Sequence, residues 1–519
     1  MNGVNHPAPH RDGPFGRPLF DSPEARALSR VGVVDVGSNS VRLVVFDGAA
    51  RSPAYFFNEK VMCGLGAGMA ETGRLDPAGR VRALDALRRF AHVADGLGTG
   101  PLNAVATAAV REAEDGPDFV AEVERETGIR LFVIDGPEEA RLSAQGVLLG
   151  WPGAYGLVCD MGGSSMELAE IDGGRVGRCV SAQLGPLKLR DLKGGKKARK
   201  ALIRDTVERL REGLGEQRNR LFLVGGSWRA IARIDMVRRG YPLHVLHEYR
   251  MTAADLRATI KHIGKHDADA LRLQSGVSAS RIALVPYAAE VLREVVRSFR
   301  PHDIAVSSYG IREGLLYEQM PDALRERDPL IEACRFSEAK DARLPGFGRV
   351  IYRFVAPLYR SARPERLRLV KAACLLHDVS WRAHPDYRAE DCFDNATRAN
   401  LGGLKHSERV FLGLALLHRY SNKRAGTRFD MLEALISERE REEAEILGRA
   451  LRLGAMLWLT GERDIARLRW HPRRKVLGID LEPDAAALFG EVARARFKAL
   501  AGALGAAPEL RVGHRKVPL

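Results

Sequence analysis

The chain has 519 residues, 45% of them hydrophobic, which predicts several globular domains. Its formal net charge of +15 favours a polyanionic partner, such as a nucleic acid, an inorganic polyphosphate, a nucleotide or an acidic membrane, although a basic surface that serves only solubility is the alternative. No apolar run reaches the roughly 18 to 20 residues of a membrane span, and the six cysteines are spread singly. We therefore expect a cytoplasmic protein without a disulfide framework and without a membrane partner.

The first part of the chain alternates strand-like and helical segments. Residues 1–29 are rich in Pro, Gly, Arg and His without periodicity, which predicts a disordered leader. From Val31 the pattern is typical of an α/β domain. The expected strands are residues 31–37, 41–47, 103–110 and 130–136, and the expected helices are residues 76–98 and 116–128.

The rest of the chain changes character twice. A helix is expected over residues 136–150, and α/β alternation then continues to about residue 320. Beyond a polar linker, Leu, Ala and Arg at helical spacing predict an all-helical region, and a short tail adds a strand or two and a helix. The expected divisions are 1–29 (leader), 30–138 and 139–322 (α/β domains), 323–462 (helical domain) and 463–519 (C-terminal lobe).

One sequence pattern occurs twice. VVDVGSNSVRLVVFDG at residues 33–48 recurs in outline as CDMGGSSMELAEIDGG at residues 159–174. Each copy runs from an apolar segment through Asp, Gly and small polar residues into a second apolar segment and Asp-Gly. The repetition predicts a duplicated domain whose two Gly-containing hairpins form opposite sides of one phosphate-binding cleft, because turn amides form a nest for anions. An ordinary hairpin, with Gly and Ser chosen for turn geometry, is the alternative for either copy.

The two copies differ at positions that bear charge. The first has Asn39 and Arg42 where the second has Ser164 and Glu167. Asp160 and Glu167 are then two carboxylates that reach the mouth of the cleft, a ligand type that suits Mg²⁺. The alternative to a metal ligand is that the aspartate at the strand end only caps a turn.

Several segments, in this order and spacing, resemble a known family, that of the exopolyphosphatases and guanosine pentaphosphate phosphohydrolases. The resemblance implies two ribonuclease-H-like domains of the actin and sugar-kinase superfamily, a mainly helical C-terminal region related to His-Asp phosphohydrolases, a Mg²⁺ cofactor and a homodimer. The segments are DVGSNSVRLVV, TAAVREA, IDGPEEARLSAQGV, CDMGGSSMEL, LGPLKL, VGGSWRAIARI and VSSYGIREGLL.

The resemblance also implies roles for individual residues. Glu139 is the expected general base, although Glu138 and Glu139 also suit the positive end of a helix. Arg111 is expected to contact the transferred phosphate, although it is also compatible with a surface position at a helix start. Asp160 and Glu167 match the metal-associated positions, and Ser164 replaces a glycine that is common in the family. The phosphate loops are Gly37, Ser38, Asn39 and Ser40, and Gly162, Gly163, Ser164 and Ser165.

Two further features bear on function. A basic run over residues 187–204 is either a solvated helix face or a guide for a long polyanion, and few aromatic residues interleave the charges, so binding of single-stranded nucleic acid is not favoured. In the helical region, His377, Asp378 and His384 lack the earlier histidine that a two-metal site needs, so we interpret them as structural or as part of a substrate channel. The expected channel residues of the basic run are Lys188, Lys196, Lys197, Arg199 and Lys200.

These observations predict an enzyme that removes terminal orthophosphate from linear polyphosphate. Guanosine pentaphosphate, cleaved at its 5′ γ-phosphate, is the alternative substrate, and the motifs hardly separate the two. A related ATP-dependent kinase and a non-catalytic binding protein for polyphosphate or RNA remain as other classes.

Overall fold

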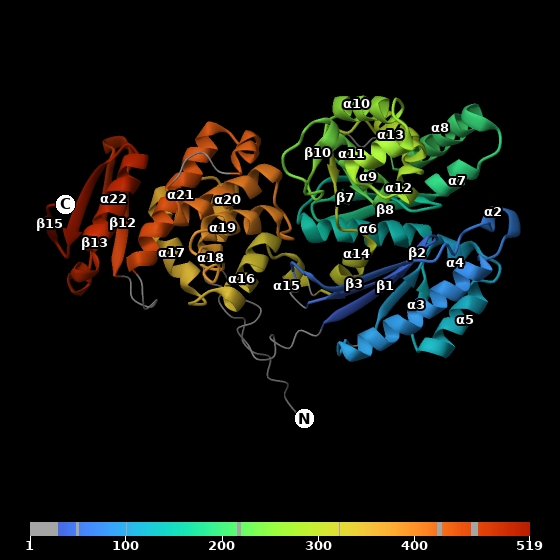
Figure 1. The fold of residues 1–519 in the computed structure, drawn as a ribbon, viewed down its shortest axis with the longest axis horizontal. Helices are drawn as coiled ribbons and strands as arrows, with labels where there is room; N and C mark the ends of the chain where they lie inside the picture. The colour runs from blue at the N-terminus through green and yellow to red at the C-terminus, as the bar shows by residue number, and fades with distance from the viewer. Residues whose placement is uncertain are drawn as a thin grey trace. The chain divides into compact units, whose positions relative to one another are not determined.

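The chain folds as two compact units, and the division between them falls between Pro329 and Leu330. The computed structural model describes residues 30–47, 51–99, 101–214, 220–320, 322–422, 428–457 and 465–519, and the expected leader lies outside these ranges. Figure 1 shows an α/β N-terminal unit and a mainly helical C-terminal unit with a small sheet at its end. The expected fold class is thus confirmed.

The first sheet of the N-terminal unit has the strand order β3-β2-β1-β4-β5. β1 pairs antiparallel with β2 and parallel with β4, so the hairpin strand and the crossover strand lie on opposite sides of β1. The apolar runs of β1 and β2 are almost wholly buried, whereas β3 alternates exposed and half-buried residues as an edge strand does. Its strands are β1 (Val31–Val36), β2 (Ser40–Phe46), β3 (Tyr55–Met62), β4 (Asn103–Ala106) and β5 (Leu131–Val133).

The second sheet repeats this arrangement. Its order is β10-β11-β9-β6-β7-β8, and β6 pairs antiparallel with β7 and parallel with β9, as β1 does with β2 and β4. The expected duplication is therefore present in the topology, with β10 added at one edge. The strands are β6 (Gly156–Met161), β7 (Met166–Asp172), β8 (Arg175–Ala182), β9 (Arg220–Val224), β10 (Arg250–Met251) and β11 (Asp303–Val306).

Helices cover the two sheets and fill the space between them. In Figure 1, α6 and α14 lie between the sheets, and one hydrophobic cluster joins Val33 of the first sheet, Phe222 of the second and Ala144 of α6. The helices of this unit are α2 (Met69–Thr72), α3 (Pro77–Gly96), α4 (Ala108–Glu112), α5 (Gly116–Thr127), α6 (Gly136–Gly150), α7 (Pro186–Asp191), α8 (Gly195–Leu214), α9 (Gly226–Arg238), α10 (Ala253–Ile263), α11 (Ala268–Ser275), α12 (Ala279–Ile282), α13 (Val285–Phe299), α14 (Ile311–Glu318) and α15 (Asp322–Arg325).

The crossing of α6 and α14 depends on glycine. A Cβ atom on Gly314 would lie 1.8 Å from the carbonyl oxygen of Leu142, and one on Gly146 would lie 2.1 Å from that of Gly310. Any larger residue would therefore push the two helices apart. Because α6 begins at the expected phosphate cleft, this close contact helps to fix the position of Glu139.

Two expectations for the first α/β domain were wrong in detail. The strand expected over residues 103–110 ends at Ala106, and α4 follows from Ala108, because the Ala-Ala-Val segment favours a helix after Thr107. The strand β3 was not expected, since its polar residues break the apolar run that marked its neighbours.

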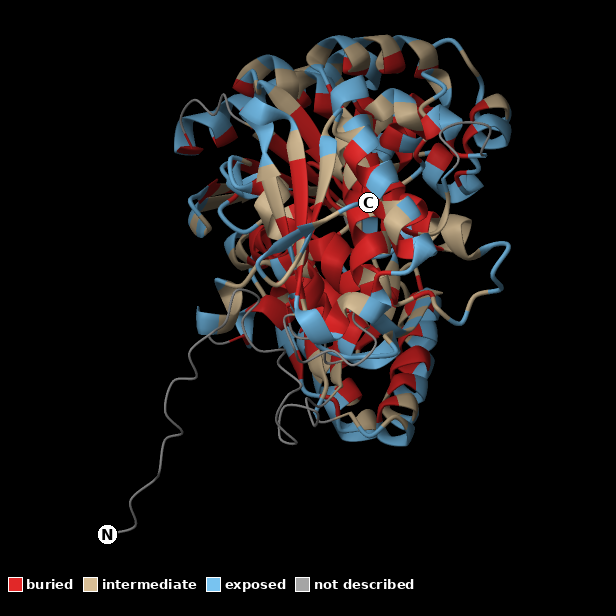
Figure 2. Ribbon diagram, turned by 90° about the vertical axis from the view of Figure 1, so that its left-hand side faces the viewer, coloured by how far each residue is buried: buried red, intermediate tan, exposed pale blue. Residues whose placement is uncertain are grey.

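The C-terminal unit combines a helical bundle and a sheet with the order β12-β13-β14-β15. In both units the buried residues lie on the inner faces of the helices and strands (Figure 2). No helix within the described ranges is both long enough and apolar enough to span a bilayer. The elements are α16 (Pro329–Asp341), α17 (Phe347–Val355), α18 (Pro364–Leu376), α19 (Arg388–Arg398), α20 (His406–Tyr420), α21 (Glu438–Leu457), α22 (Glu491–Ala503), β12 (Ala466–His471), β13 (Val476–Leu481), β14 (Ala507–Val512) and β15 (Arg515–Val517), with short 3₁₀ turns at Ala356–Tyr359, Asp430–Leu435, Pro472–Arg474 and Pro483–Leu488.

Candidate phosphate-binding site

The two repeated hairpin turns face each other. The hydroxyl oxygens of Ser38 and Ser164 are 3.0 Å apart, so the turns meet directly. Each turn is closed by the same bond: the amide of Gly37 donates to the carbonyl of Ser40 at 3.0 Å, and that of Gly162 to the carbonyl of Ser165 at 3.1 Å. The structure thus brings together the two segments that the sequence repeat identified.

The first turn is held by the loop that follows β3. The amide of Gly64 donates to the carbonyl of Asn39 at 3.1 Å, and the amide of Gly66 donates to that of Ser38 at 2.8 Å. These bonds use the carbonyl groups of the turn. The loop therefore takes up none of the turn's amide groups, which are the groups that form an anion nest.

The second turn is held in the same way by the loop that follows β8. The amide of Gly185 donates to the carbonyl of Ser164 at 2.9 Å, and the amide of Leu187 donates to that of Gly163 at 2.9 Å. A Cβ atom on Gly185 would lie 2.3 Å from the carbonyl oxygen of Gly163, so the loop approaches the turn as closely as only glycine permits.

A cavity of about 240 Å³ opens between the two turns. All eight residues of the expected phosphate loops line it, together with Glu139 and Asp160. Leu187 and Leu284 line it as well, at the points where α7 and α13 approach the cleft.

Asp160 and Glu167 form an acidic pair, because they are directly opposite each other on the paired strands β6 and β7. Ser143 of α6 donates a hydrogen bond to Oδ2 of Asp160, and Ser181 donates to Oε1 of Glu167 at 3.0 Å. Oε2 of Glu167 is buried without a hydrogen-bond partner. Burial and the neighbouring Asp160 raise the pKa of Glu167 to about 8, and burial also raises the pKa of Asp160.

The acidic pair fits a magnesium ion in its donor chemistry. Within the described ranges, no group of three or more His, Cys, Asp and Glu residues is arranged to hold a metal ion by itself. Mg²⁺ commonly takes one or two protein carboxylates and completes its shell with water and substrate phosphate. Asp160 and Glu167, with the unpartnered Oε2 of Glu167, supply that number of ligands.

The two glutamates at the start of α6 have different environments. Glu138 accepts hydrogen bonds from Arg141 at 2.8 and 2.6 Å, in an ion pair at the surface. Glu139 is buried, lines the cleft, and its Oε2 has no hydrogen-bond partner. Burial raises the pKa of Glu139 well above its ordinary value, and the carboxylates of Glu167 and Asp160 add to the rise. A favourable interaction with the helix dipole alone does not explain this difference between neighbours.

Arg111 at the end of α4 lies beside Glu139. Its Nη1 donates to the carbonyl of Ile134 at 2.7 Å and lies 3.6 Å from Oε2 of Glu139. The guanidinium lowers the pKa of Glu139 and partly offsets the effect of burial. Arg111 itself does not line the cavity. Its influence on the cleft is therefore indirect, through its contact with Glu139.

Five basic side chains line the cleft, and sequence reasoning named only Arg42 among them, without assigning it a role. Burial, aided by nearby arginines, lowers the pKa of Lys60 to about 8. Burial and Arg312 lower the pKa of Arg42 to about 10. Arg229 and Arg312 belong to the segments VGGSWRAIARI and VSSYGIREGLL, which offered a signal, whereas Lys60 and Arg281 belong to no recognised segment. The set is Arg42, Lys60, Arg229, Arg281 and Arg312.

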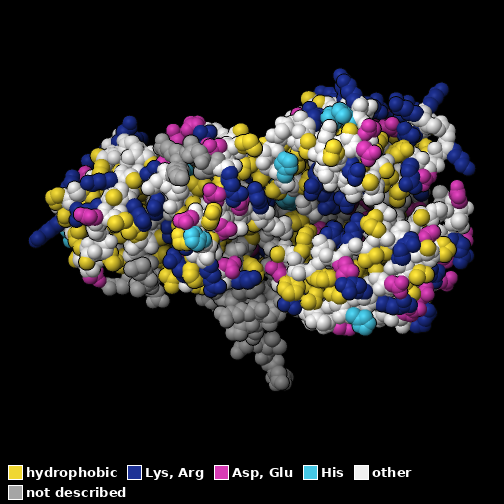
Figure 3. Space-filling view, in the orientation of Figure 1, with side chains coloured by type: hydrophobic (Ala, Val, Ile, Leu, Met, Phe, Trp, Pro, Cys, Tyr) yellow, Lys and Arg dark blue, Asp and Glu magenta, His cyan; other side chains and the backbone are white. Residues whose placement is uncertain are grey.

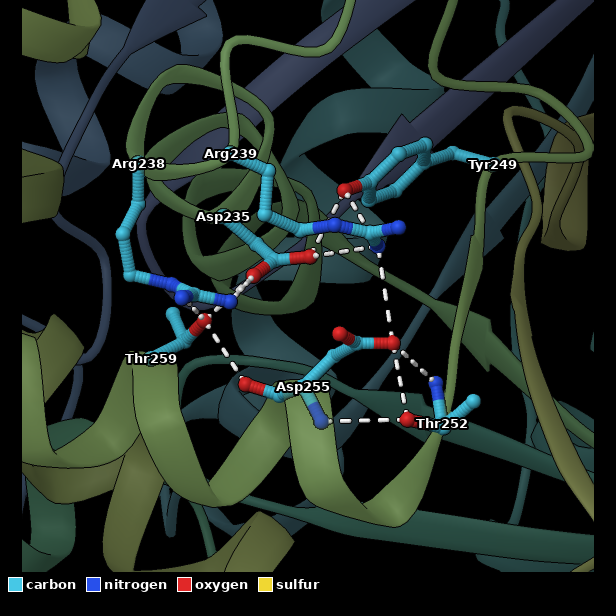
Figure 4. A network of polar contacts seen from close by, with 7 residues as sticks. All are labelled: Asp235, Arg238, Arg239, Tyr249, Thr252, Asp255 and Thr259. Atoms are coloured by element: carbon cyan, nitrogen blue, oxygen red, sulfur yellow. Dashed lines mark hydrogen bonds and ion pairs between the residues drawn. The ribbon is translucent and has the colours of Figure 1, made fainter. Parts of the chain in front are cut away.

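The position of α9, which carries Arg229, is fixed by a buried polar network (Figure 4). Asp235 of α9 is fully buried and accepts hydrogen bonds from the hydroxyls of Tyr249 at 2.6 Å and Thr259 at 2.5 Å. Arg238 adds an ion pair at 2.7 Å. The network joins the C-terminal end of α9 to α10 and so anchors the helix whose first turn carries Arg229.

The residues of the expected polyanion channel lie outside the cleft lining. Lys188 of α7 is 3.5 Å from Glu112, and Arg199 of α8 pairs with Glu290 at 2.8 Å. Lys197 and Lys200 line a separate cavity, and Lys196 is exposed on α8. Figure 3 shows Lys and Arg side chains over α8 and in the hollow between the two α/β lobes.

In the C-terminal unit, internal contacts occupy the His-Asp segment. Arg343 donates to both oxygens of Asp378, at 2.8 and 2.5 Å, and Nδ1 of His377 lies 2.7 Å from the carbonyl oxygen of Cys374. Burial and Arg419 lower the pKa of His377 to about 4. His384 is exposed and lies 3.6 Å from Asp386. These contacts favour the structural interpretation of the segment.

Comparison with known proteins places these features in a family. The chain is 27% identical to "Exopolyphosphatase 1" of Mycobacterium tuberculosis, over 59% of this chain and 92% of that protein, and 26% identical to "Exopolyphosphatase 2" of the same organism, over 56% and 98%. The crystal structure of an exopolyphosphatase from Cytophaga hutchinsonii matches 56% of this chain and 97% of its own, with 24% identity and a TM-score of 0.51. The family model for the C-terminal part of exopolyphosphatases matches residues 352–510. The model of the Ppx/GppA phosphatase family matches residues 44–323, more than half of the chain, which therefore belongs to that family.

Proposed function

We propose that the protein is an exopolyphosphatase that hydrolyses the terminal phosphoanhydride bond of linear inorganic polyphosphate. The observation that carries the proposal is the pair of opposed turns with the buried carboxylate of Glu139 beside them. The similarity to two mycobacterial exopolyphosphatases supports the same substrate class.

The basic lining of the cleft favours polyphosphate over a nucleotide. Five Lys and Arg side chains surround the cavity, and no aromatic residue is among the described residues that line it. A guanine base would therefore find cations but no ring on which to stack, whereas a chain of phosphates needs cations only. The same family includes enzymes for guanosine pentaphosphate, which therefore remains the substrate for comparison.

In the proposed reaction the two turns bind the terminal phosphate. Amides and hydroxyls of the Ser38 and Ser164 turns donate to its oxygens, and Glu139 accepts a proton from the attacking water. The water oxygen forms a bond to the terminal phosphorus while the bridging P–O bond breaks, which releases orthophosphate and a chain shorter by one phosphate. A raised pKa suits Glu139 to this task, since a stronger base takes the proton more readily.

The charge that develops on the phosphoryl group needs positive partners. Arg111 holds Glu139 in position in this proposal, and the cleft-lining Arg229 and Arg312 face the transferred group. Asp160 and Glu167 would hold Mg²⁺, which when bound neutralises charge on the phosphate oxygens. Lys188, close to the cleft-lining Leu187, would attract the polyanion toward the cleft.

The test is phosphate release by the purified full chain with Mg²⁺. Long-chain polyphosphate, guanosine pentaphosphate, ATP and RNA are supplied separately, and kcat/KM is measured for each. We expect the highest value for polyphosphate. A higher value for guanosine pentaphosphate would assign the alternative substrate, and binding of polyphosphate without turnover would indicate a non-catalytic protein. Sedimentation of the same sample tests the proposed homodimer.

A further inference from the structure

A second basic cavity lies on the N-terminal unit, apart from the phosphate cleft. It has a volume of about 420 Å³ and lies between α8 and α13. We call it the α8–α13 groove. Its lining residues are Lys197, Lys200, Ala201, Ile203 and Arg204 of α8 and Glu290, Arg293, Glu294 and Arg297 of α13.

The spacing of these residues places them in two facing stripes. The charged members are spaced i, i+3, i+7 on α8 and i, i+3, i+4, i+7 on α13, which places each set on one helical face. Further along α8, Val207 and Leu210 are buried in the hydrophobic core of the unit, which fixes the helix in place. The groove is therefore a continuous basic surface made by two rigid helices and not a scatter of loop lysines.

The carboxylates of the groove are already paired. Glu290 accepts hydrogen bonds from Arg199 at 2.8 and 3.1 Å, and Glu294 accepts from Nε of Arg297 at 3.1 Å. These pairs neutralise both acidic side chains of the groove.

Three basic residues of the groove keep their charge available. Within the described part of the chain, Lys197, Lys200 and Arg293 form no ion pair, and all three are exposed. The groove therefore has a surplus of positive charge with donors free for an anion.

The groove and the phosphate cleft are joined by α13. Leu284, the residue before α13, lines the cleft, and Arg293 and Arg297 follow on the same helix. At 1.5 Å per residue, these two arginines lie about 14 and about 20 Å from Leu284 along the helix axis. A linear polyanion whose end is in the cleft therefore needs only a short internal segment to reach the groove.

We propose that the α8–α13 groove is a second binding site for phosphate groups, and that it holds an internal segment of the polyphosphate chain whose terminal phosphate lies in the cleft. This inference rests on the proposed function. A linear polyphosphate presents a negative charge at every residue and needs no ring-stacking surface. None of the described residues that line the groove is aromatic, and the ring of Tyr287 on α13 already has the guanidinium of Arg199 at 5.0 Å from its centre, which disfavours a nucleic acid base.

The test compares long-chain polyphosphate with tripolyphosphate, which is too short to occupy both sites. The triple variant Lys197→Ala/Lys200→Ala/Arg293→Ala is assayed in the full chain with Mg²⁺. We expect its KM for the long chain to rise about tenfold more than its KM for tripolyphosphate at low salt, and the difference to shrink at high salt. Circular dichroism verifies that the variant is folded.

A matched control removes the same charge elsewhere. Arg211→Ala/Lys261→Ala/Lys265→Ala changes three exposed basic residues outside the groove and is expected to raise both KM values equally and slightly. The inference is overturned if the groove variant changes the two KM values by the same factor, or if the control reproduces its effect. If free inorganic phosphate added to the assay changes tripolyphosphate turnover through the same three residues, the groove is an effector site and the inference is wrong.

The proposed function can fail separately. If the wild type releases phosphate from neither chain, the proposed function is wrong. Direct binding of long-chain polyphosphate to the wild type and to the groove variant then decides the inference, because equal binding by both proteins contradicts it.

Discussion

At the scale of single residues, the site depends on the different environments of two neighbouring glutamates. Glu138 is engaged by Arg141 at the surface, whereas Glu139 is buried in the cleft with a raised pKa. The sequence alone gives both the same preference for a helix start. Their environments therefore make a matched pair of variants.

We expect Glu139→Gln to lower kcat for polyphosphate by about 10² to 10⁴, because the amide cannot accept the proton of the attacking water. Binding of polyphosphate, measured by titration calorimetry, should be retained. The control Glu138→Gln loses only a surface ion pair and should keep near-normal kcat. Equal losses in the two variants would contradict the assignment.

The lowered pKa of Lys60 predicts a pH dependence of substrate capture. Lys60 is charged below about pH 8 and neutral above it, so kcat/KM for polyphosphate should fall as the pH rises through about 8. Lys60→Arg keeps its charge at this pH and should remove the inflection. The exposed Lys265→Arg is the control and should leave the profile unchanged. An inflection that survives in Lys60→Arg would assign it to another group.

Sequence reasoning found some site residues and missed others for a definite reason. Ser38 and Ser164 were found because the turn sequence that contains them occurs twice in the chain. Lys60 and Ser143 contribute through contacts between distant segments, and neither lies in a spacing that marks its role. A pattern in one segment cannot show which side chain of another segment faces it.

At the scale of secondary-structure elements, α6 and α14 determine how precisely the site is held. Their contact has no space for a side chain at Gly314, where a Cβ atom would lie 1.8 Å from a backbone oxygen. Backbone atoms cannot move aside as a flexible side chain does. The strain must therefore be relieved by a shift of a whole helix.

We expect Gly314→Ala to lower the free energy of unfolding by about 1 to 3 kcal/mol and to reduce kcat, because the shift of α6 displaces Glu139. Denaturant unfolding and phosphate release measure the two effects. Gly96→Ala, at the end of α3 with nothing within 4 Å of the added methyl, is the control and should be neutral or slightly stabilising. Wild-type stability of Gly314→Ala would contradict the close contact.

Sequence periodicity predicted elements well where one face is strongly apolar. β1, β2, α3 and α5 were expected within a few residues of their observed bounds. β3 was missed because it is an edge strand with polar residues in its apolar run. α4 was taken for strand because its short apolar run continues that of β4, and periodicity cannot assign so short a run. Burial by tertiary packing decided these cases.

At the scale of the whole molecule, the two compact units should differ in their response to acid. His377 is buried in the C-terminal unit, and its pKa is lowered to about 4 from an ordinary 6.5. As the pH falls, His377 binds a proton near pH 6.5 in the unfolded chain but only near pH 4 in the folded unit. The stabilisation is therefore complete above pH 6.5 and is lost progressively as the pH falls toward 4.

We expect calorimetry to show a transition of the C-terminal unit that loses up to about 1.4 kcal/mol per pH unit from this group between pH 6.5 and 4. His377→Asn, whose amide can donate to the carbonyl of Cys374, should reduce that slope. The exposed His384→Asn is the control and should retain it. An unchanged slope in His377→Asn would assign the acid response to other groups.

Arg42 and Glu167 occupy equivalent positions in the two repeated hairpins, and their opposite charges affect the whole enzyme. Each residue faces its partner aspartate at the same place in its own hairpin, Asp35 in one copy and Asp160 in the other. Two identical copies would make a clamp with twofold symmetry, which has no means to distinguish one side of a bound phosphate from the other. The exchange of one charge sign at this position gives the clamp a polarity. In the proposed reaction we expect the anion's remaining chain on the cationic side and the incoming water on the carboxylate side.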